Sequence, residues 1–294
     1  MPLPPSIVDA HHHVWNLADR PQPWLDTDSA LAPLRRSFLL PDLAPQAAAV
    51  GVTATVVVQT VSEPGETPEL LSLAAAGPLV AAVVGWTDLA APGVADALGE
   101  FAAMPGGQRL AGIRHPLLTE PDPGWLDRSD IRRGLADLAA AGLTFDLVLR
   151  PGQLPAAVHA AASLPDLRFV LDHLGNVEVR PRPDPTWAAA FAALAGLPNS
   201  VCKLSGIFSV PAPRDGHGRD RDDPVAHLRP YLDVALDCFG PDRLMFGSDW
   251  PVCTLGASYD AVVAAALALT AELTDTERAA IFGGTARAVY GIGG

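Results

Sequence analysis

Three consecutive histidines near the start of the chain are the residues best suited to chemistry. His11, His12 and His13 end a short apolar run, residues 6–9, that is typical of a β-strand. Side chains alternate between the two faces of a strand, so His11 and His13 point the same way and His12 points the opposite way. Two imidazoles on one face of a strand can chelate a divalent metal or flank a reacting group.

A carboxylate near the other end of the chain occurs in a comparable setting. Asp249 follows an apolar run and lies in the sequence Phe-Gly-Ser-Asp-Trp-Pro, residues 246–251. A carboxylate at this place can take a proton from water or bind a metal beside imidazoles. It can also form a structural ion pair inside a barrel, but we favour catalysis for Asp249.

The elements that must position these residues alternate regularly. Short β-branched or leucine-rich runs recur along the chain, separated by alanine- and leucine-rich segments with helical spacing. This alternation predicts an α/β protein, a (β/α)₈ TIM barrel that residues 1–294 form as one domain. An open doubly wound sheet would normally carry a glycine-rich loop after its first strand, where this chain has histidines. The predicted strands span residues 6–9, 53–59, 82–86, 110–114, 144–150, 168–172, 200–204 and 243–247.

The helices between these strands carry alanine and leucine at helical spacing, and several end at glycine or proline. A last helix starts with the capping-box pattern of residues 274–277. The other predicted helices span residues 66–76, 94–103, 131–141, 154–163, 186–195, 228–238 and 258–273.

Two segments are longer than a minimal barrel needs. Residues 14–41 follow the first predicted strand and carry Trp15 and Trp24, whereas residues 209–230 follow the seventh and are rich in charge. Both segments follow strands, so both lie on the catalytic face of a barrel. We expect the first to form an aromatic wall of a pocket. The second is interpreted as a mobile flap, a disordered loop or a tolerated surface insertion.

Polar residues follow most of the predicted strands, at the edge where a barrel would gather them. Any one of them can be explained by a strand end that meets water. Imidazoles and cations that converge on one carboxylate indicate instead an enzyme that binds a carbonyl oxygen and activates water. Arg114, Arg150 and Lys203 are compatible with substrate binding and with ion pairing inside the barrel. These strand-end residues are His11, His13, Arg114, His115, Arg150, His173, Lys203 and Asp249.

Composition narrows the class of protein. The formal net charge of −13, from 20 basic and 33 acidic residues, argues against binding to nucleic acid or to an anionic membrane. No long apolar segment predicts a membrane span, and the first residues lack the pattern of a signal peptide. Three cysteines without Cys-x-x-Cys spacing indicate buried thiols in a reducing cytosol. We expect a cytoplasmic enzyme that acts on a small molecule. Whether it forms a homo-oligomer is left open at this point.

Several motifs occur in order along nearly the whole chain: VDAHHHVW (8–15), GIRH (112–115), LRP (149–151), LDHLG (171–175), CKLSG (202–206), RLMFGSDWP (243–251) and IFGGTA (281–286). Together they resemble the amidohydrolase superfamily, in the branch called amidohydrolase-related or amidohydrolase 2. Within that branch the chain is most similar to sugar-lactone hydrolases of the L-fuconolactonase and L-rhamnonolactonase type. Hydrolases of muconolactones and pyrone lactones share the same frame.

The resemblance implies roles for four residues. His11 and His13 match the superfamily's His-x-His metal pair on the first strand. Asp249 matches the aspartate that takes a proton from the attacking water, and His173 matches a metal-site or carbonyl-polarising histidine. The implied activity is hydrolysis of a lactone, a cyclic carboxylic ester, most similar to the conversion of a sugar lactone to its sugar acid.

The chain also departs from the superfamily's binuclear pattern. Binuclear members carry a bridging Lys or Glu on strand four and a His on strand five, where this chain has Arg114 and Arg150. The resemblance therefore implies one divalent metal, with zinc expected, on His11, His13 and Asp249, and His173 stays open as a further ligand. Some members of the branch work without a metal, so a metal-independent site stays open as the alternative.

Ring opening needs a water nucleophile, a base and groups that stabilise the carbonyl oxygen. We expect Asp249 to act as the base and then to return the proton to the leaving alkoxide. His173, with Arg114 or Lys203, is expected to stabilise the tetrahedral oxyanion. The residues expected to bind the rest of the substrate are Arg150, His115, Trp15 and Trp24.

Three alternatives stay open from the sequence. A metal-dependent decarboxylase of an aromatic or muconate-type acid would use the same histidine pair and aspartate. A hydrolase of an anionic muconolactone or pyrone lactone would differ in how many of Arg114, Arg150 and Lys203 face a substrate carboxylate. The third alternative is a non-catalytic barrel used for binding or assembly. The presence of the histidines and Asp249 argues against it.

Overall fold

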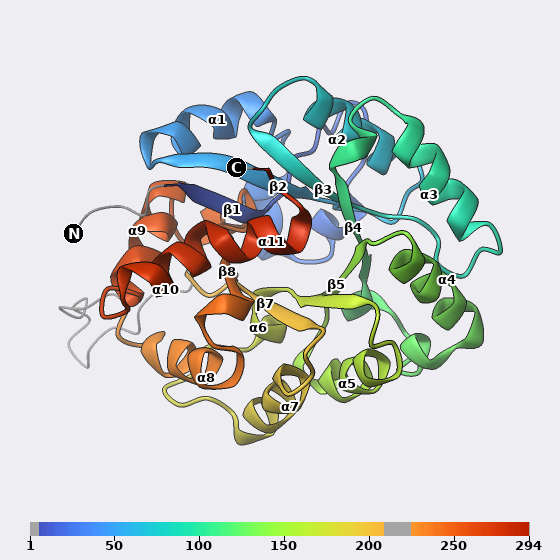
Figure 1. Cartoon of the computed structure of the whole chain (residues 1–294). Helices are drawn as coiled ribbons and strands as arrows, with labels where there is room; N and C mark the ends of the chain where they lie inside the picture. Colours follow the sequence, from blue (N-terminus) through green and yellow to red (C-terminus); the bar gives the residue numbers. More distant parts are fainter. Residues whose placement is uncertain (1–5, 209–224, 294) are drawn as a thin grey trace.

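A computed structural model describes residues 6–208 and 225–293. Its parallel strands neighbour one another in chain order from β1 to β8. A bridge between His12 and Trp250 joins the first and last strands, so the sheet is a nearly closed barrel with helices around it (Figure 1). The predicted TIM barrel is confirmed. The strands are β1 Ile7–His12, β2 Val52–Val58, β3 Val80–Gly85, β4 Leu110–Pro116, β5 Thr144–Val148, β6 Arg168–Leu171, β7 Ser200–Leu204 and β8 Leu244–Phe246.

Each predicted helix is present, with ends that differ by a few residues. The largest difference concerns α9, which ends at Leu269, where the prediction continued to residue 273. Helix α1 was not predicted, because Pro41 and Pro45 lie within it and proline is unfavourable in most helix positions. The helices are α1 Leu40–Ala49, α2 Glu66–Ala75, α3 Val94–Ala103, α4 Ser129–Ala140, α5 Leu154–Ser163, α6 His173–Asn176, α7 Pro185–Ala195, α8 Arg229–Phe239, α9 Tyr259–Leu269, α10 Asp275–Ala279 and α11 Thr285–Tyr290.

The barrel interior is apolar at the end where the strands begin. Small inward-facing residues from the strands pack there against Ala286, Tyr290 and Ile292. Helix α11 lies across this end and seals it (Figure 1). A larger apolar layer separates the sheet from the surrounding helices. The inward-facing apolar residues of the strands are Val8, Ala10, Ala54, Val56, Val58, Ala82, Val84, Ala111, Val170, Val201 and Met245.

An irregularity in β1 decides where the histidines point. Asp9 pairs with Thr55 and His12 pairs with Val57, so β1 has one residue more than β2 over the same stretch. Such a β-bulge re-aims the side chains that follow it. Without the bulge, strict alternation would put His11 on the same outer face as Asp9.

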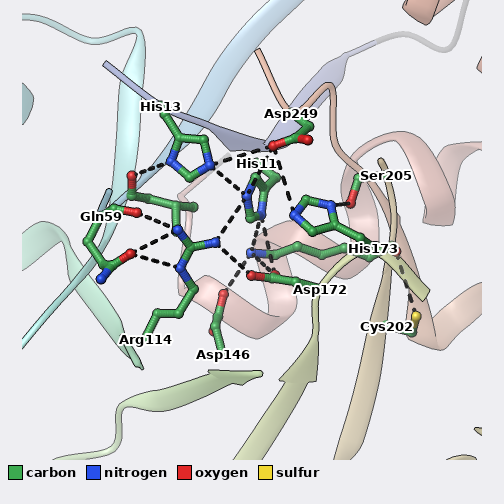
Figure 2. Close-up of polar contacts among 12 residues, drawn as sticks. His11, His13, Gln59, Arg114, Asp146, Asp172, His173, Cys202, Ser205 and Asp249 are labelled. Atoms are coloured by element: carbon green, nitrogen blue, oxygen red, sulfur yellow. Dashed lines mark hydrogen bonds and ion pairs between the residues drawn. The ribbon is translucent and has the colours of Figure 1, made fainter. Parts of the chain in front are cut away.

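The bulge turns two of the histidines inward. His11 and His13 point into the barrel, as Figure 2 shows. His12 points away from them, and its Nε2 lies 2.9 Å from the Thr55 hydroxyl. The predicted orientation of the triplet, with the middle histidine opposite the other two, is confirmed.

The long segment after β1 packs over the open end of the barrel. It contains the 3₁₀ turns Pro23–Asp26 and Ser29–Leu34, and Trp15 and Phe38 within it are buried. The second predicted long segment spans residues 209–230. Its residues 209–224 lie outside the described part of the chain. Among the described helices, none is both long enough and apolar enough to cross a membrane.

Candidate active site

A pocket of about 570 Å³ opens at the ends of the strands, where a barrel carries its functional residues. Both polar and apolar side chains line the pocket. The polar lining residues include His13, Gln59, Thr60, Arg114, Thr119, His173, Asn176 and Asp249. The apolar lining residues include Trp24, Pro116, Leu118, Val148, Val252 and Leu255.

Three side chains from the first and last strands meet at the floor of this pocket. The Nε2 atoms of His11 and His13 lie 3.2 Å apart. Asp249 Oδ1 lies 3.7 Å from His11 Nε2 and 3.6 Å from His13 Nε2 (Figure 2). Donors at 2.0–2.1 Å from a tetrahedral zinc ion would be about 3.3–3.4 Å apart. The chemistry and spacing of the three donors therefore fit one divalent metal.

The hydrogen bond of His13 suits a metal ligand. Its Nδ1 lies 2.7 Å from the carbonyl oxygen of Val58, and a carbonyl only accepts. The proton of a neutral His13 therefore sits on Nδ1, and the lone pair of Nε2 faces His11 and Asp249. His11 is fully buried, and burial holds its pKa well below the usual range. Neutral imidazoles are the form that binds metals.

Hydrogen bonds between the ends of β1 and β8 hold Asp249 in place. The backbone N–H of Asp249 donates to the His11 carbonyl at 2.8 Å. Asp9, behind His11, accepts hydrogen bonds from the Ser248 N–H, the Ser248 hydroxyl and the Tyr259 hydroxyl. Asp249 adopts φ +60°, a left-handed conformation that is costly for a residue with a side chain. The buried Asp9 network stabilises this conformation, which is typical of functional sites.

His173 is presented by a turn of unusual handedness. His173, Leu174, Gly175 and Asn176 all have positive φ values, between 52° and 74°. Left-handed turns cost roughly 1–2 kcal/mol for each residue other than glycine. The Trp187 indole donates to the Leu174 carbonyl at 2.9 Å, and the Asn176 amide donates to the carbonyl of Leu149, just after β5, at 2.8 Å. These contacts hold the His173 ring beside the pocket, with Nε2 3.9 Å from Asp249 Oδ1.

Arg114 is held at the pocket by two partners. Its Nε and Nη2 donate to Gln59 Oε1 at 3.1 and 2.9 Å, and Nη2 also donates to the Gln59 carbonyl. Its Nη1 lies 3.0 Å from Asp172 Oδ2 and 3.4 Å from His11 Nε2. The guanidinium is therefore oriented and charge-balanced before any substrate binds.

A layer of paired charges lies beneath the histidines. Lys203 Nζ is fully buried and lies 2.7 Å from Asp146 Oδ2, 3.0 Å from Asp172 Oδ1 and 3.1 Å from His11 Nδ1. The Tyr290 hydroxyl donates to Asp146 at 2.7 Å. Burial would raise the pKa of Asp172, but Lys203, His11 and Arg114 outweigh burial and hold it well below the usual range. Asp172 therefore stays ionised, with its Oδ1 3.3 Å from His11 Nδ1.

The structure brings five of the residues predicted for catalysis or metal binding to the pocket or its floor, and it places Lys203 beneath them. Lys203 does not line the pocket, because its ammonium group is enclosed by two carboxylates and His11. Its effect on chemistry must pass through His11 or through Asp172, which holds Arg114, so a direct contact between Lys203 and an oxyanion is not expected. The five residues are His11, His13, Arg114, His173 and Asp249.

Of the residues predicted to bind the rest of the substrate, only Trp24 lines the pocket. Trp15 is buried behind it, with its indole N–H donating to the Arg36 carbonyl. The Arg150 side chain is exposed at a turn, away from the lining. His115 stacks on Trp125 at a ring distance of 4.2 Å instead of facing the pocket. Trp15 is turned away because the segment after β1 folds over it.

Several residues that support the site were not predicted as members of it. Asp146 is the clearest case, because a carboxylate inside an apolar strand is costly unless a cation pairs with it. That signal was readable in the sequence, although its partner Lys203 was not. The other supporting residues are Gln59, Asp172, Ser205, Ser248 and Tyr290.

Comparison with known proteins assigns the family. A sequence model described as "Amidohydrolase" matches residues 8–292 of the chain. The chain belongs to the amidohydrolase family. The predicted resemblance to amidohydrolases is thereby confirmed.

Two similar relatives and one similar solved structure span nearly the whole chain. An L-fucono-1,5-lactonase of Burkholderia multivorans is 40% identical, with 97% of this chain and 96% of the relative covered. An L-fucono-1,5-lactonase of Burkholderia ambifaria is 34% identical, with 97% and 95% covered. The crystal structure of a Burkholderia multivorans amidohydrolase with bound zinc has a TM-score of 0.85 at 37% identity, with 98% and 99% covered.

Proposed function

We propose that this amidohydrolase opens the ring of a sugar lactone by hydrolysis and releases the sugar acid. The observation that carries the proposal is the likeness, across nearly the whole chain, to two L-fucono-1,5-lactonases. The arrangement of the site supports the same reaction. A carboxylate faces three imidazoles beside a pocket large enough for a monosaccharide-sized ligand.

Asp249 is proposed as the base. Its carboxylate borders the pocket and, within the described part of the chain, no lysine or arginine pairs with it. It takes a proton from water while the water oxygen bonds to the lactone carbonyl carbon. When the tetrahedral intermediate collapses, the ring C–O bond breaks and Asp249 returns the proton to the alkoxide. The products are one carboxylic acid and one hydroxyl group.

The developing negative charge on the carbonyl oxygen needs a donor that is already in place. His173 and Arg114 both border the pocket, and His173 Nε2 lies 3.9 Å from Asp249 Oδ1. We propose His173 as the donor to the oxyanion. Arg114 supplies positive charge beside it, and most of its N–H groups are already held by Gln59 and Asp172.

His11, His13 and Asp249 are the residues that would hold a metal, and zinc is proposed because imidazole and carboxylate donors suit it. The zinc-bound structure of the similar Burkholderia multivorans amidohydrolase supports this choice. A bound zinc ion would lower the pKa of water toward about 7. Asp172 Oδ1, 3.3 Å from His11 Nδ1, and the Val58 carbonyl, bonded to His13 Nδ1, lie behind the two rings and orient them.

The mixed lining of the pocket suits a sugar ring. Gln59, Thr60 and Asn176 offer hydrogen-bonding groups, and Trp24 offers an indole face. A sugar has polar hydroxyl edges and apolar C–H faces. The polar lining residues can bind the hydroxyl groups, and the apolar ones can pack against the C–H faces. Trp24 is proposed to pack against one ring face.

The test is acid release, followed with a pH indicator, on freshly prepared 1,5- and 1,4-aldonolactones and on muconolactone. The spontaneous rate is subtracted, and an Asp249→Asn variant serves as the matched control. We expect fast turnover of a sugar 1,5-lactone by the wild type alone. A folded, metal-loaded wild type that accelerates none of the lactones would overturn the proposal.

A further inference from the structure

The strand-six histidine has two conceivable uses, as a metal ligand or as a hydrogen-bond donor, and the position of one proton separates them. A histidine ligates through a nitrogen that carries no hydrogen, and it donates through one that does. The choice is made by whatever bonds to the other ring nitrogen. For His173 that partner is Ser205, which follows β7.

We propose that Ser205 is a positioning residue that fixes His173 with its proton on Nε2, so that His173 donates to the substrate instead of ligating the metal. This inference rests on the proposed function for the identity of the acceptor. The position of the proton itself follows from contacts within the protein.

The first observation is a tight, buried contact. Ser205 is fully buried, and its hydroxyl oxygen lies 2.8 Å from His173 Nδ1 (Figure 2). The next residue, Gly206, has φ +74°, and a Cβ there would come within 2.9 Å of the His173 Cβ. The end of β7 therefore presses against His173, which leaves the hydroxyl and the ring little freedom to separate.

The second observation concerns the hydroxyl hydrogen. In the described part of the chain, His173 Nδ1 is the hydrogen-bond partner found for Ser205 Oγ. If Ser205 donates to Nδ1, its hydrogen is satisfied and the ring proton goes to Nε2. If Nδ1 donates instead, the hydroxyl hydrogen stays buried without an acceptor. That penalty disfavours the second arrangement on the order of ten- to a hundredfold.

His13 provides the contrast inside the same site. Its Nδ1 faces the Val58 carbonyl, which accepts and cannot donate, so its Nε2 is left without a proton. Ser205 faces His173 with a group that can donate. The two histidines border the same pocket and receive opposite proton positions from their neighbours. His13 is thereby prepared to ligate, and His173 is prepared to donate to the lactone carbonyl oxygen.

The direct test is long-range ¹H–¹⁵N NMR of the imidazole nitrogens in the ¹⁵N-labelled full chain without added metal. The His173 signals are assigned from their loss in His173→Gln. We expect Nε2 protonated and Nδ1 unprotonated for His173, with the reverse for His13. A protonated Nδ1 on His173 would overturn the proposal. This readout does not depend on turnover, so it holds even if no lactone is a substrate.

Variants of Ser205 extend the test to function. Ser205→Ala is expected to give a mixed His173 signal and a roughly tenfold lower kcat on the lactone turned over by the wild type. KM and zinc content should stay within about twofold of the wild type, and Ser205→Thr should restore kcat. Loss of zinc from Ser205→Ala, in step with activity, would show His173 to be a ligand and would overturn the proposal.

Ser200→Ala is the matched control. Ser200 is buried at the other end of the same strand, and its hydroxyl donates to the carbonyls of Leu194 and Leu197. This variant also removes one buried hydroxyl from β7, but it should leave the His173 signals and kcat unchanged. An equal loss of kcat in Ser200→Ala would mean that any hydroxyl in β7 has the same effect, which would overturn the role of Ser205.

Discussion

The two ends of the barrel interior use the same strands in opposite ways. Where the strands begin, the inward residues are mainly valines and alanines that pack on Tyr290 and Ala286 of α11. Where the strands finish, they are imidazoles and carboxylates beside a pocket of about 570 Å³. The charged layer around Lys203 lies between the two ends.

The difference shows how this protein separates stability from chemistry. In the middle layer each carboxylate has a cation, because an unpaired charge away from water is costly. At the pocket, Asp249 is 11% exposed and faces only imidazoles among the described residues. A carboxylate without a cationic partner keeps its capacity to take a proton or bind a metal. The following changes test this division.

Asp249→Asn should have the largest effect on activity. Removing a general base typically costs about 10²–10⁴-fold in rate, so we expect kcat to fall by that amount. The free energy of unfolding should stay near that of the wild type, because Asp249 has no cation to leave unpaired. Lactone turnover and denaturant unfolding measure the two quantities. A folded variant with wild-type turnover would remove Asp249 from the mechanism.

Lys203→Met should show its largest effect on stability. The change leaves Asp146 without its cation and Asp172 with Arg114 alone, which should cost about 3–5 kcal/mol in the free energy of unfolding. Tyr290→Phe removes one hydrogen bond to Asp146 and should cost only about 1 kcal/mol. Urea unfolding of both variants gives the comparison. Equal stability of Lys203→Met and the wild type would refute the need for paired charges in this layer.

His13→Gln should lower zinc affinity without unfolding the barrel. Outer partners of metal ligands already contribute about 10–100-fold to affinity, so loss of a ligand should cost more than that. His12→Gln is the matched control, since His12 points to Thr55 on the opposite face. Zinc content after dialysis, measured by mass spectrometry, should fall only for His13→Gln. A similar loss in both variants would contradict the assignment of ligands by strand face.

Trp24 and Trp15 form a pair with opposite expected effects. Trp24→Ala should raise KM about two- to twelvefold, since an aromatic contact contributes about 0.5–1.5 kcal/mol. Trp15→Ala should leave KM unchanged but lower the free energy of unfolding by about 3–5 kcal/mol, because Trp15 packs on Phe38 in the core. Initial rates and unfolding curves separate the two. A raised KM in Trp15→Ala alone would reverse the assignment.

Much of the fold could be predicted because its signals are local. Apolar runs, helical spacing and glycine or proline stops gave all the strands and most helices within a few residues of their observed ends. Helix α1 was missed because Pro41 and Pro45 contradict the local pattern, while its packing and the Asp42 cap on Leu39 stabilise it. Local propensity failed where tertiary contacts outweighed it.

For the site, too, some features could be predicted from local signals and others depend on tertiary contacts. The barrel topology brings strand ends together, so the convergence of His11, His13, His173 and Asp249 could be predicted from strand order alone. The direction of longer side chains could not be predicted. Lys203 turns toward Asp146 beneath the pocket, and His115, at the end of β4, stacks on Trp125. Those choices depend on partners that are distant in the chain.

The order of strands and helices, and the histidines and aspartate at the strand ends, follow from local patterns in the chain. Which of these residues face the pocket depends on how the strands pair in the folded barrel. The bulge in β1 illustrates the reason, because one extra residue against β2 turns His11 from the outer face into the barrel. Side-chain direction depends on register between strands, and register is set by packing across the sheet.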